Sequence, residues 1–233
     1  MNEDLNFETY LFVGSKKLII SVQTNFNDKI FEKELIFDLN KDQLIFDKLE
    51  HFLNENIFEI ERKLKYFVKK ISVILDLNEF LPVEISIKKN NYENVINLAG
   101  LNHILNEVKD YCKKTIGEKR IVHMIISNYK VDNKDFLSLP LNITCKSFSL
   151  DVNFLCIPNN LIKNLEKILK KYHISLYKIL SAKYINEFLK DEKTDLFTMA
   201  KKITEGYNPN EVVMINKTSK NLGFFEKFFN FFN

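Results

Sequence analysis

The chain has 233 residues, of which 45% are hydrophobic, five are Gly and four are Pro. This length suits one large domain or two small ones, and the composition excludes a disordered or loop-dominated chain. The 34 basic and 31 acidic residues give a net charge of +3 and are mixed along the sequence, which excludes the footprint of a nucleic-acid-binding protein.

Cysteine usage and the N-terminus both indicate a reducing compartment. Cys112, Cys145 and Cys156 are an odd, widely spaced set without a CxxC motif, so we expect buried thiols rather than disulfides or a zinc site. Residues 1–4 are acidic and polar and carry no signal-peptide pattern, and no segment has the length and apolarity of a transmembrane helix. We therefore expect a cytosolic protein.

The first third of the chain predicts a β-meander followed by a long helix. Three apolar, β-branched runs with a hairpin turn at residues 14–17 predict strands at residues 10–13, 18–23 and 30–38. Asn40 is expected to cap a helix whose apolar residues recur at helical spacing as far as Val68, with a break near residues 54–56. Two compact apolar runs predict strands at residues 71–75 and 82–87.

The remainder alternates between helical and strand patterns. A helical pattern over residues 94–116 ends at Gly117, which is a good C-terminal cap residue. After it we expect, in chain order, strands at 120–132 and 148–157, a helix from Asn159 or Asn160 to Tyr172, a strand at 174–181, helical turns at 182–189 and 195–205, and a short apolar run at 211–215.

Six of the last eleven residues are Phe, and they lie on one face of a helix. At roughly 100° per residue the six fall within an arc of about 160°, opposite Glu226 and Lys227. We interpret this segment as a membrane-surface helix, and a helix docked on its own domain is the alternative. The membrane-binding residues are expected to be Phe224, Phe225, Lys227, Phe228, Phe229, Phe231 and Phe232.

Other candidate sites favour structural interpretations. Ser15, Lys16 and Lys17 are expected to form a hairpin turn rather than a phosphate-binding loop, since a single Gly cannot build a backbone cradle. His123 lies in an alternating apolar strand and is expected to be packed rather than catalytic. The Lys pairs at 69–70, 113–114 and 170–171 are interpreted as helix ends and solvated faces. We expect no catalytic residue, no cofactor and no metal.

The order of elements from residue 120 to 181 resembles the insert subdomain of FtsA, the bacterial actin-like cell-division protein that ties FtsZ filaments to the membrane. Residues 121–125 (Ile-Val-His-Met-Ile) look like the family's Ile-Leu-His-Val-Ile strand, and residues 129–132 resemble its Tyr-x-hydrophobic-Asp. Pro140-Leu141 stands where the family has Asn-Pro-Leu-Gly, and residues 148–157 are similar to its next strand, without that strand's His.

The meander and residues 72–75 resemble the family's first actin-like subdomain, and the Phe-rich end resembles its membrane-targeting helix. Two departures stand out. Phe12 replaces the acid of the family's Asp-Ile-Gly-Thr-Thr-Lys phosphate loop, and nothing after Asp191 resembles the second actin-like half with its Asp-x-Gly-Gly-Gly-Thr loop. Because that half closes over ATP and carries the main FtsZ-binding surface, we expect no ATP binding and leave FtsZ binding open.

We therefore predict an α+β, actin-like fold of two small subdomains and an amphipathic helix. The predicted divisions are a first actin-like subdomain at 1–92, an FtsA-type insert at 93–190, a short helix and linker at 191–221, and the membrane-targeting helix at 222–233.

The function implied by the resemblance is a cell-division adaptor, peripheral on the cytoplasmic face of the inner membrane at the division site. Its expected partners are the lipid surface, division proteins and other copies of itself, with no nucleic acid. The alternatives are an adaptor like the FtsA-related pilus-assembly protein, a nucleotide-dependent actin-like ATPase, and a soluble structural module whose Phe helix packs internally.

Overall fold

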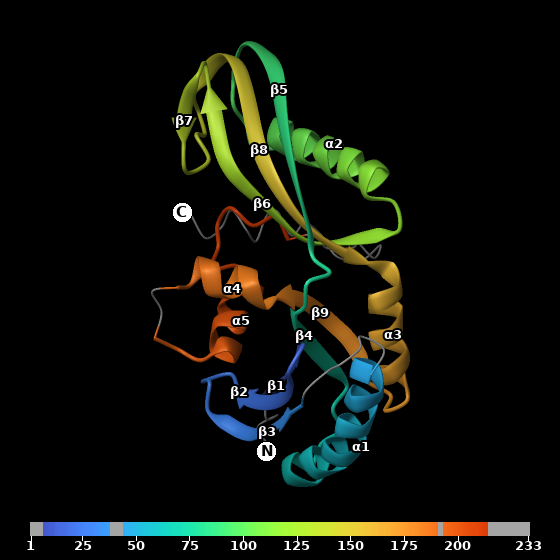
Figure 1. Cartoon of the computed structure of the whole chain (residues 1–233). Coiled ribbons are helices and arrows are strands. Elements are labelled where there is room, and N and C mark those ends of the chain that lie inside the picture. Colours follow the sequence, from blue (N-terminus) through green and yellow to red (C-terminus); the bar gives the residue numbers. More distant parts are fainter. Residues whose placement is uncertain (1–6, 38–43, 191–192, 214–233) are drawn as a thin grey trace.

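The computed structural model describes residues 7–37, 44–190 and 193–213, which form two β-sheets and five helices (Figure 1). The strands are β1 (Phe7–Gly14), β2 (Lys17–Thr24), β3 (Lys29–Ile36), β4 (Lys70–Asp76), β5 (Leu81–Val95), β6 (Lys119–Val131), β7 (Lys134–Phe136), β8 (Thr144–Pro158) and β9 (Ser175–Ser181). The helices are α1 (Leu44–Leu64), α2 (Leu98–Ile116), α3 (Asn159–Lys170), α4 (Ala182–Phe188) and α5 (Leu196–Thr204).

The five-stranded sheet has the order β3-β2-β1-β4-β9. The meander β1-β2-β3 is antiparallel as expected, whereas β1 pairs with β4 and β4 pairs with β9 in parallel. Parallel neighbours need a long crossover, and the chain between β4 and β9 supplies it with α3 and the whole second sheet.

Both faces of the five-stranded sheet are buried. Leu11 and Val73 face a core shared with α1 and α3, while Tyr10, Phe12 and Ile74 face a second core built by α4 and α5. Strands covered on both faces are expected to be continuously apolar, as residues 71–75 are.

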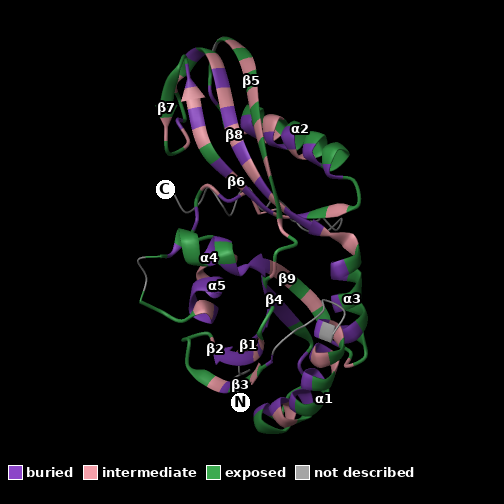
Figure 2. Cartoon of the chain, viewed as in Figure 1, coloured by how far each residue is buried: buried purple, intermediate pink, exposed green. Residues whose placement is uncertain are grey.

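The four-stranded sheet has the order β5-β8-β6-β7 and is antiparallel throughout. Only one face carries a core, which it shares with α2. Figure 2 shows the result as an alternation of buried and less buried residues along β8, where Leu150, Val152 and Phe154 are buried and the residues between them are not.

The sheets divide the chain differently from the predicted boundary at residues 92 and 93. That boundary falls inside β5, which belongs to the second sheet, and residues 159–181 return to the first sheet as α3 and β9. The physical reason is that α3 turns Leu161, Ile162 and Leu165 into the core under β1 and β4. The second sheet is therefore an insertion between two neighbouring strands of the first.

Several local predictions need correction. Helix α1 is unbroken near residues 54–56, and the buried Asn56 side-chain amide is satisfied by the Phe52 carbonyl one turn earlier. It ends at Leu64, so Lys69 and Lys70 do not end a helix but lead into β4. The short strand β7 was not predicted, and β5 is longer than residues 82–87.

The α+β class predicted from the sequence is confirmed, and so are the three buried cysteines. The predicted linker at 191–221 is described in part, as α5 and a short segment at residues 208–213. The Phe-rich segment at residues 222–233, with all of the predicted membrane-binding side chains, lies outside the described residues.

Candidate functional site

A short C-terminal segment, residues 208–213, joins the two sheets, and we call it the strap. The strap pairs with the edge of β6 through one antiparallel bridge between Ile125 and Glu211. The Ile126 amide donates to the Asn210 carbonyl at 2.9 Å, and the Val212 amide donates to the Met124 carbonyl at 2.8 Å. The strap thus acts as a short extra strand on an edge that β7 leaves open, since β7 pairs only with residues 129–131 of β6.

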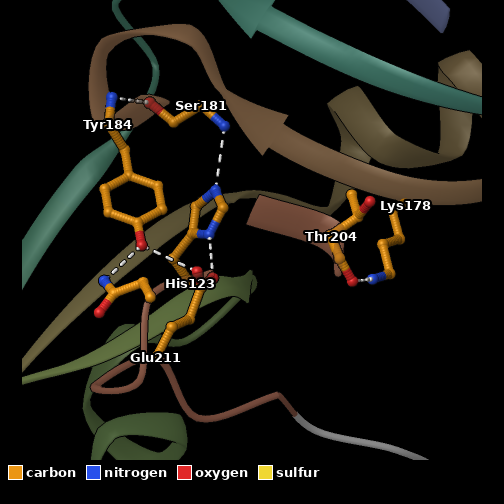
Figure 3. A network of polar contacts seen from close by, with 7 residues as sticks. His123, Lys178, Ser181, Tyr184, Thr204 and Glu211 are labelled. Atoms are coloured by element: carbon orange, nitrogen blue, oxygen red, sulfur yellow. Dashed lines mark hydrogen bonds and ion pairs between the residues drawn. The ribbon is translucent and has the colours of Figure 1, made fainter. Parts of the chain in front are cut away.

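The side chain of Glu211 is the centre of a buried polar network between the sheets (Figure 3). His123 Nε2 accepts the Ser181 backbone N–H at 3.0 Å, so the ring proton is on Nδ1, which donates to Glu211 Oε1 at 2.7 Å. The Tyr184 hydroxyl donates to Glu211 Oε2 at 2.8 Å and accepts the Asn208 side-chain amide at 2.8 Å. Four segments are therefore tied together: β6, the end of β9, α4 and the strap.

Burial sets the electrostatics of this network. His123 is 2% exposed and Glu211 is 8% exposed, so each depends on the other for hydrogen bonding. Burial, and then the negative charge of Glu211, raises the pKa of the Tyr184 phenol above its ordinary value. Burial also lowers the pKa of the Lys178 ammonium, which donates to the Thr204 carbonyl at 2.9 Å, although the Glu211 carboxylate opposes this shift.

A cavity of about 310 Å³ lies beside the network, between the two sheets. One wall is β9 from Leu176 to Leu180, and the opposite wall is the start of β6 from Arg120 to His123. The end of α5 and the strap close it, with Ile203, Thr204 and Val213 in the lining. At the rim Arg120 and Glu166 form an exposed ion pair at 3.4 Å.

The backbone of both walls is available for pairing. β9 is an edge strand of its sheet, and no described residue pairs with its outer side. In the described part of the chain, the β6 edge before Met124 also lacks a strand partner on the strap side. Unpaired strand edges are templates for an added extended segment. Leu176 and Ile179 of β9 add partly buried apolar side chains to the lining of this cavity.

The structure places the sequence-predicted residues as follows. Residues 14–17 form the β1–β2 hairpin turn, as expected, and His123 is packed, as expected. The Ser181 hydroxyl accepts the Tyr184 amide as the N-cap of α4. No group of three His, Cys, Asp or Glu side chains suited to a metal ion occurs among the residues that the structure describes.

Sequence reasoning missed Tyr184, Asn208 and Glu211. Glu211 lies 88 positions from His123, and Asn208 lies 24 positions from Tyr184, so no local spacing links them. The available signal was an acid at the head of the apolar run at 211–215, which is an unusual place for a solvated side chain.

The residue that replaces the expected acid of the phosphate loop is part of the core. Phe12 is 4% exposed and packs beside Ile74 and Leu180 under α4 and α5. Its ring lies so close to Gly14 that a Cβ atom there would approach it to 2.7 Å. The turn after β1 is thus filled by an aromatic ring.

The search for similar proteins finds only structural neighbours. No protein-family model matches the sequence, and no curated protein does. Among solved structures, the chain is similar to the PilM–PilN type IV pilus biogenesis complex, with 7% identity and a TM-score of 0.47, covering 79% of this chain and 49% of that chain.

Two further solved structures match with lower TM-scores. The cytoplasmic domain of EpsL, an inner-membrane component of the type II secretion system of Vibrio cholerae, has 8% identity and a TM-score of 0.39, with coverage of 77% and 59%. A Bacteroides thetaiotaomicron protein with an actin-like ATPase fold and unknown function has 11% identity and a TM-score of 0.36, with coverage of 81% and 58%.

The chain spans 49–59% of the length of these three structures. It is an α+β protein with a central sheet in the order β3-β2-β1-β4-β9 and a second sheet inserted before α3. None of the described helices is both long enough and apolar enough to cross a membrane.

Proposed function

We propose that this chain is an adaptor that holds an extended segment of a partner protein between its two sheets, on the cytoplasmic face of the inner membrane. The observation that carries the proposal is the pair of open strand edges, β9 and the start of β6, that face one cavity of about 310 Å³. No cluster of three His, Cys, Asp or Glu side chains suited to a metal ion is found among the described residues.

The strap supports this use of the β6 edge. Its pairing with Met124 and Ile126 is strand addition performed by the chain itself. A partner segment that pairs with residues 120–122 would lie next to the strap along the same edge of β6. Its backbone hydrogen bonds would supply affinity, and the apolar wall residues would supply specificity. The ion pair of Arg120 with Glu166 and the ammonium of Lys178 place both signs of charge around the cavity, which suits a segment of mixed polarity.

The setting we propose is pilus assembly or secretion rather than cell division. The PilM–PilN complex and the EpsL domain are named for pilus biogenesis and type II secretion, and the pilus-type adaptor was the alternative from the sequence. A fluorescent fusion separates the two settings, because a division adaptor of the FtsA kind would form a band at midcell and an assembly adaptor would not.

The partner is tested by photo-crosslinking in cells. A photoreactive phenylalanine analogue at Tyr177, which is 55% exposed and lines the cavity, or at Val122 should yield a crosslink to an inner-membrane assembly protein. The same analogue at Tyr111 on α2, which is 62% exposed and outside the cavity, is the matched control. A crosslink only to the chain's own residues after Val213, or equal yields at Tyr177 and Tyr111, would contradict the proposal.

Membrane attachment through the Phe-rich end stays a prediction. Replacing Phe225 and Phe229 by Glu puts two charges among the acyl chains, so the full-length variant should float less well with vesicles than the wild type. Unchanged flotation would refute attachment through this segment.

We also infer that the adaptor binds no ATP and is not an enzyme. Support comes from Phe12, whose ring fills the turn where the resemblance expects an acid and a phosphate loop. A phosphate site needs backbone N–H groups and a metal-holding acid, and a Phe supplies neither. Calorimetry with Mg-ATP should show no heat of binding above background, and a micromolar dissociation constant would overturn this inference.

A further inference from the structure

The connection from α1 to β4 is unusually basic and carries two protruding aromatic rings. Five of the nine residues from 62 to 70 are basic. We call this surface the basic-aromatic patch, and it comprises Arg62, Lys63, Lys65, Tyr66, Phe67, Lys69 and Lys70. None of its five cations forms an ion pair with a carboxylate within 4.0 Å in the described part of the chain.

The backbone forces the two rings outward. Helix α1 ends at Leu64, and Lys65 adopts a left-handed conformation with φ of 59° that turns the chain. Val68 is 2% exposed and its amide donates to Glu61 Oε1 at 3.0 Å, which fixes the far side of the turn. Between these anchors Tyr66 is 41% exposed and Phe67 is 76% exposed. Exposing a Phe ring to water is unfavourable, so a fixed, protruding Phe indicates a contact surface.

A second cavity, of about 430 Å³, opens on this patch. Its lining includes three ammonium groups and one carboxylate, those of Lys65, Lys69, Lys70 and Glu8, so the lining carries a net charge of about +2 at neutral pH. The Lys70 ammonium lies 4.5 Å from the centre of the Tyr177 ring, which borders the same cavity. Cations with aromatic walls are suited to a phosphate group that is attached to an apolar body.

We propose that the basic-aromatic patch binds an anionic phospholipid surface directly. The ammonium groups attract the phosphates, and the rings of Tyr66 and Phe67 enter the region between headgroups and acyl chains. The Lys side chains lie along the apolar boundary with their charged ends in the headgroup layer. The near balance of 34 basic and 31 acidic residues over the whole chain favours a lipid surface over a nucleic acid, because nucleic-acid-binding domains are strongly basic.

The position of the patch suits this role. Figure 1 shows that α1 ends at the extremity of the molecule furthest from the four-stranded sheet. A protein resting on the patch therefore leaves the four-stranded sheet directed away from the lipid. Residues 62–70 of the patch do not line the first cavity, although Tyr177 borders both cavities.

The experiment uses full-length protein with vesicles of phosphatidylglycerol and phosphatidylcholine, or of phosphatidylcholine alone. All variants carry Phe225→Glu and Phe229→Glu, so that binding by the C-terminal segment is suppressed equally. The test variant adds Phe67→Ala and Lys69→Glu. The matched control adds Leu137→Ala and Lys134→Glu in the β6–β7 hairpin, where Leu137 is 85% exposed. Both pairs remove one exposed apolar side chain and change the charge by the same amount.

We expect the parent protein to sediment with phosphatidylglycerol vesicles but not with neutral ones, and to be released by salt. The test variant should bind at least tenfold more weakly, while the control binds like the parent. Circular dichroism verifies that all variants are folded, which is expected for Phe67, Lys69, Lys134 and Leu137 because these four side chains are exposed. The proposal is overturned if the folded parent does not bind, if test and control lose binding equally, or if the patch binds a DNA oligonucleotide and not vesicles.

Discussion

The two sheets differ in how they are covered, although they are continuous in one chain. The five-stranded sheet has a core on each face, under α1 and α3 on one side and under α4 and α5 on the other. The four-stranded sheet has a core only under α2, and its other face carries polar contacts such as the 2.6 Å hydrogen bond from Ser86 to Asp151. The five-stranded sheet with its helices is therefore a three-layer structure, and the four-stranded sheet with α2 is a two-layer structure.

This difference determines which parts of each sheet remain uncovered. A sheet covered on both faces can offer only its edges, and β9 is such an edge. A sheet with one open face tolerates polar side chains there and gains little stability from them. The strap lies where the two sheets meet, and the cavity of about 310 Å³ lies beside it.

The largest change in the free energy of unfolding is expected for substitutions that test how many faces of each sheet are buried. In β1, Leu11→Ala and Phe12→Ala should each lower the free energy of unfolding by about 2–5 kcal/mol, because the two side chains point into different cores. In β8, Phe154→Ala should cost a similar amount, but Asn153→Ala should change it by less than about 0.5 kcal/mol. Denaturant titration measures all four values. A large loss for Asn153→Ala would mean that the second sheet is also covered on both faces.

The second-largest change in stability is expected in the buried polar network through which the strap joins the two sheets. Glu211→Gln replaces a buried carboxylate that accepts from His123 and Tyr184, so unfolding should become easier by about 1.5–3 kcal/mol. Hydrogen exchange at the Val212 amide should accelerate with it. Glu187→Gln is the control, because Glu187 is exposed and forms a surface ion pair with Lys183 at 3.8 Å. Equal losses for the two variants would show that the strap does not depend on this network.

An alkaline titration tests the single core of the four-stranded sheet. Burial raises the pKa of Tyr129 to about 12 from an ordinary value of 10.0, so the folded protein keeps this proton after the unfolded chain has lost it. The resulting stability is present below pH 10 and is lost between pH 10 and 12, at a rate of at most about 1.4 kcal/mol per pH unit.

Tyr129→Phe should remove this contribution and make the loss of stability between pH 10 and 12 less steep. The exposed residue Tyr111 provides the control, and Tyr111→Phe should leave the slope as in the wild type. Denaturant midpoints measured at several alkaline pH values give the comparison. A steep loss that survives Tyr129→Phe would assign it to other groups, such as the Cys156 thiol, whose pKa is also raised to about 12 by burial.

The smallest change in stability is expected at helix α5, which packs on one face of the five-stranded sheet. Asp195 caps α5 by accepting the amides of Phe197 and Thr198, and Asp195→Ala should cost about 0.5–2 kcal/mol. Asp195→Asn keeps a side-chain acceptor and should cost less. Thermal unfolding distinguishes the two variants, and identical shifts would mean that charge rather than capping is responsible.

Sequence patterns predicted most of the elements, since burial leaves a local periodicity. The continuous apolar run at residues 71–75 gave β4, and the alternation at residues 148–157 gave the core of β8. Asn97 and Gly117 bound α2 as cap residues, and the sequence had indicated the glycine. The site was harder to predict from the sequence than the elements were, because His123 was the one residue of the buried polar network that the sequence patterns indicated.

What the sequence by itself determined about this protein is which residues are buried in each element and where most elements begin and end. Only the tertiary structure decided that β9 returns to pair with β4 about a hundred residues earlier, and that Glu211 meets His123. The physical reason is that periodicity records the number of buried faces of a strand but not the identity of its neighbour. That choice depends on closing long loops and on packing α3 against the first sheet, which are properties of the whole chain.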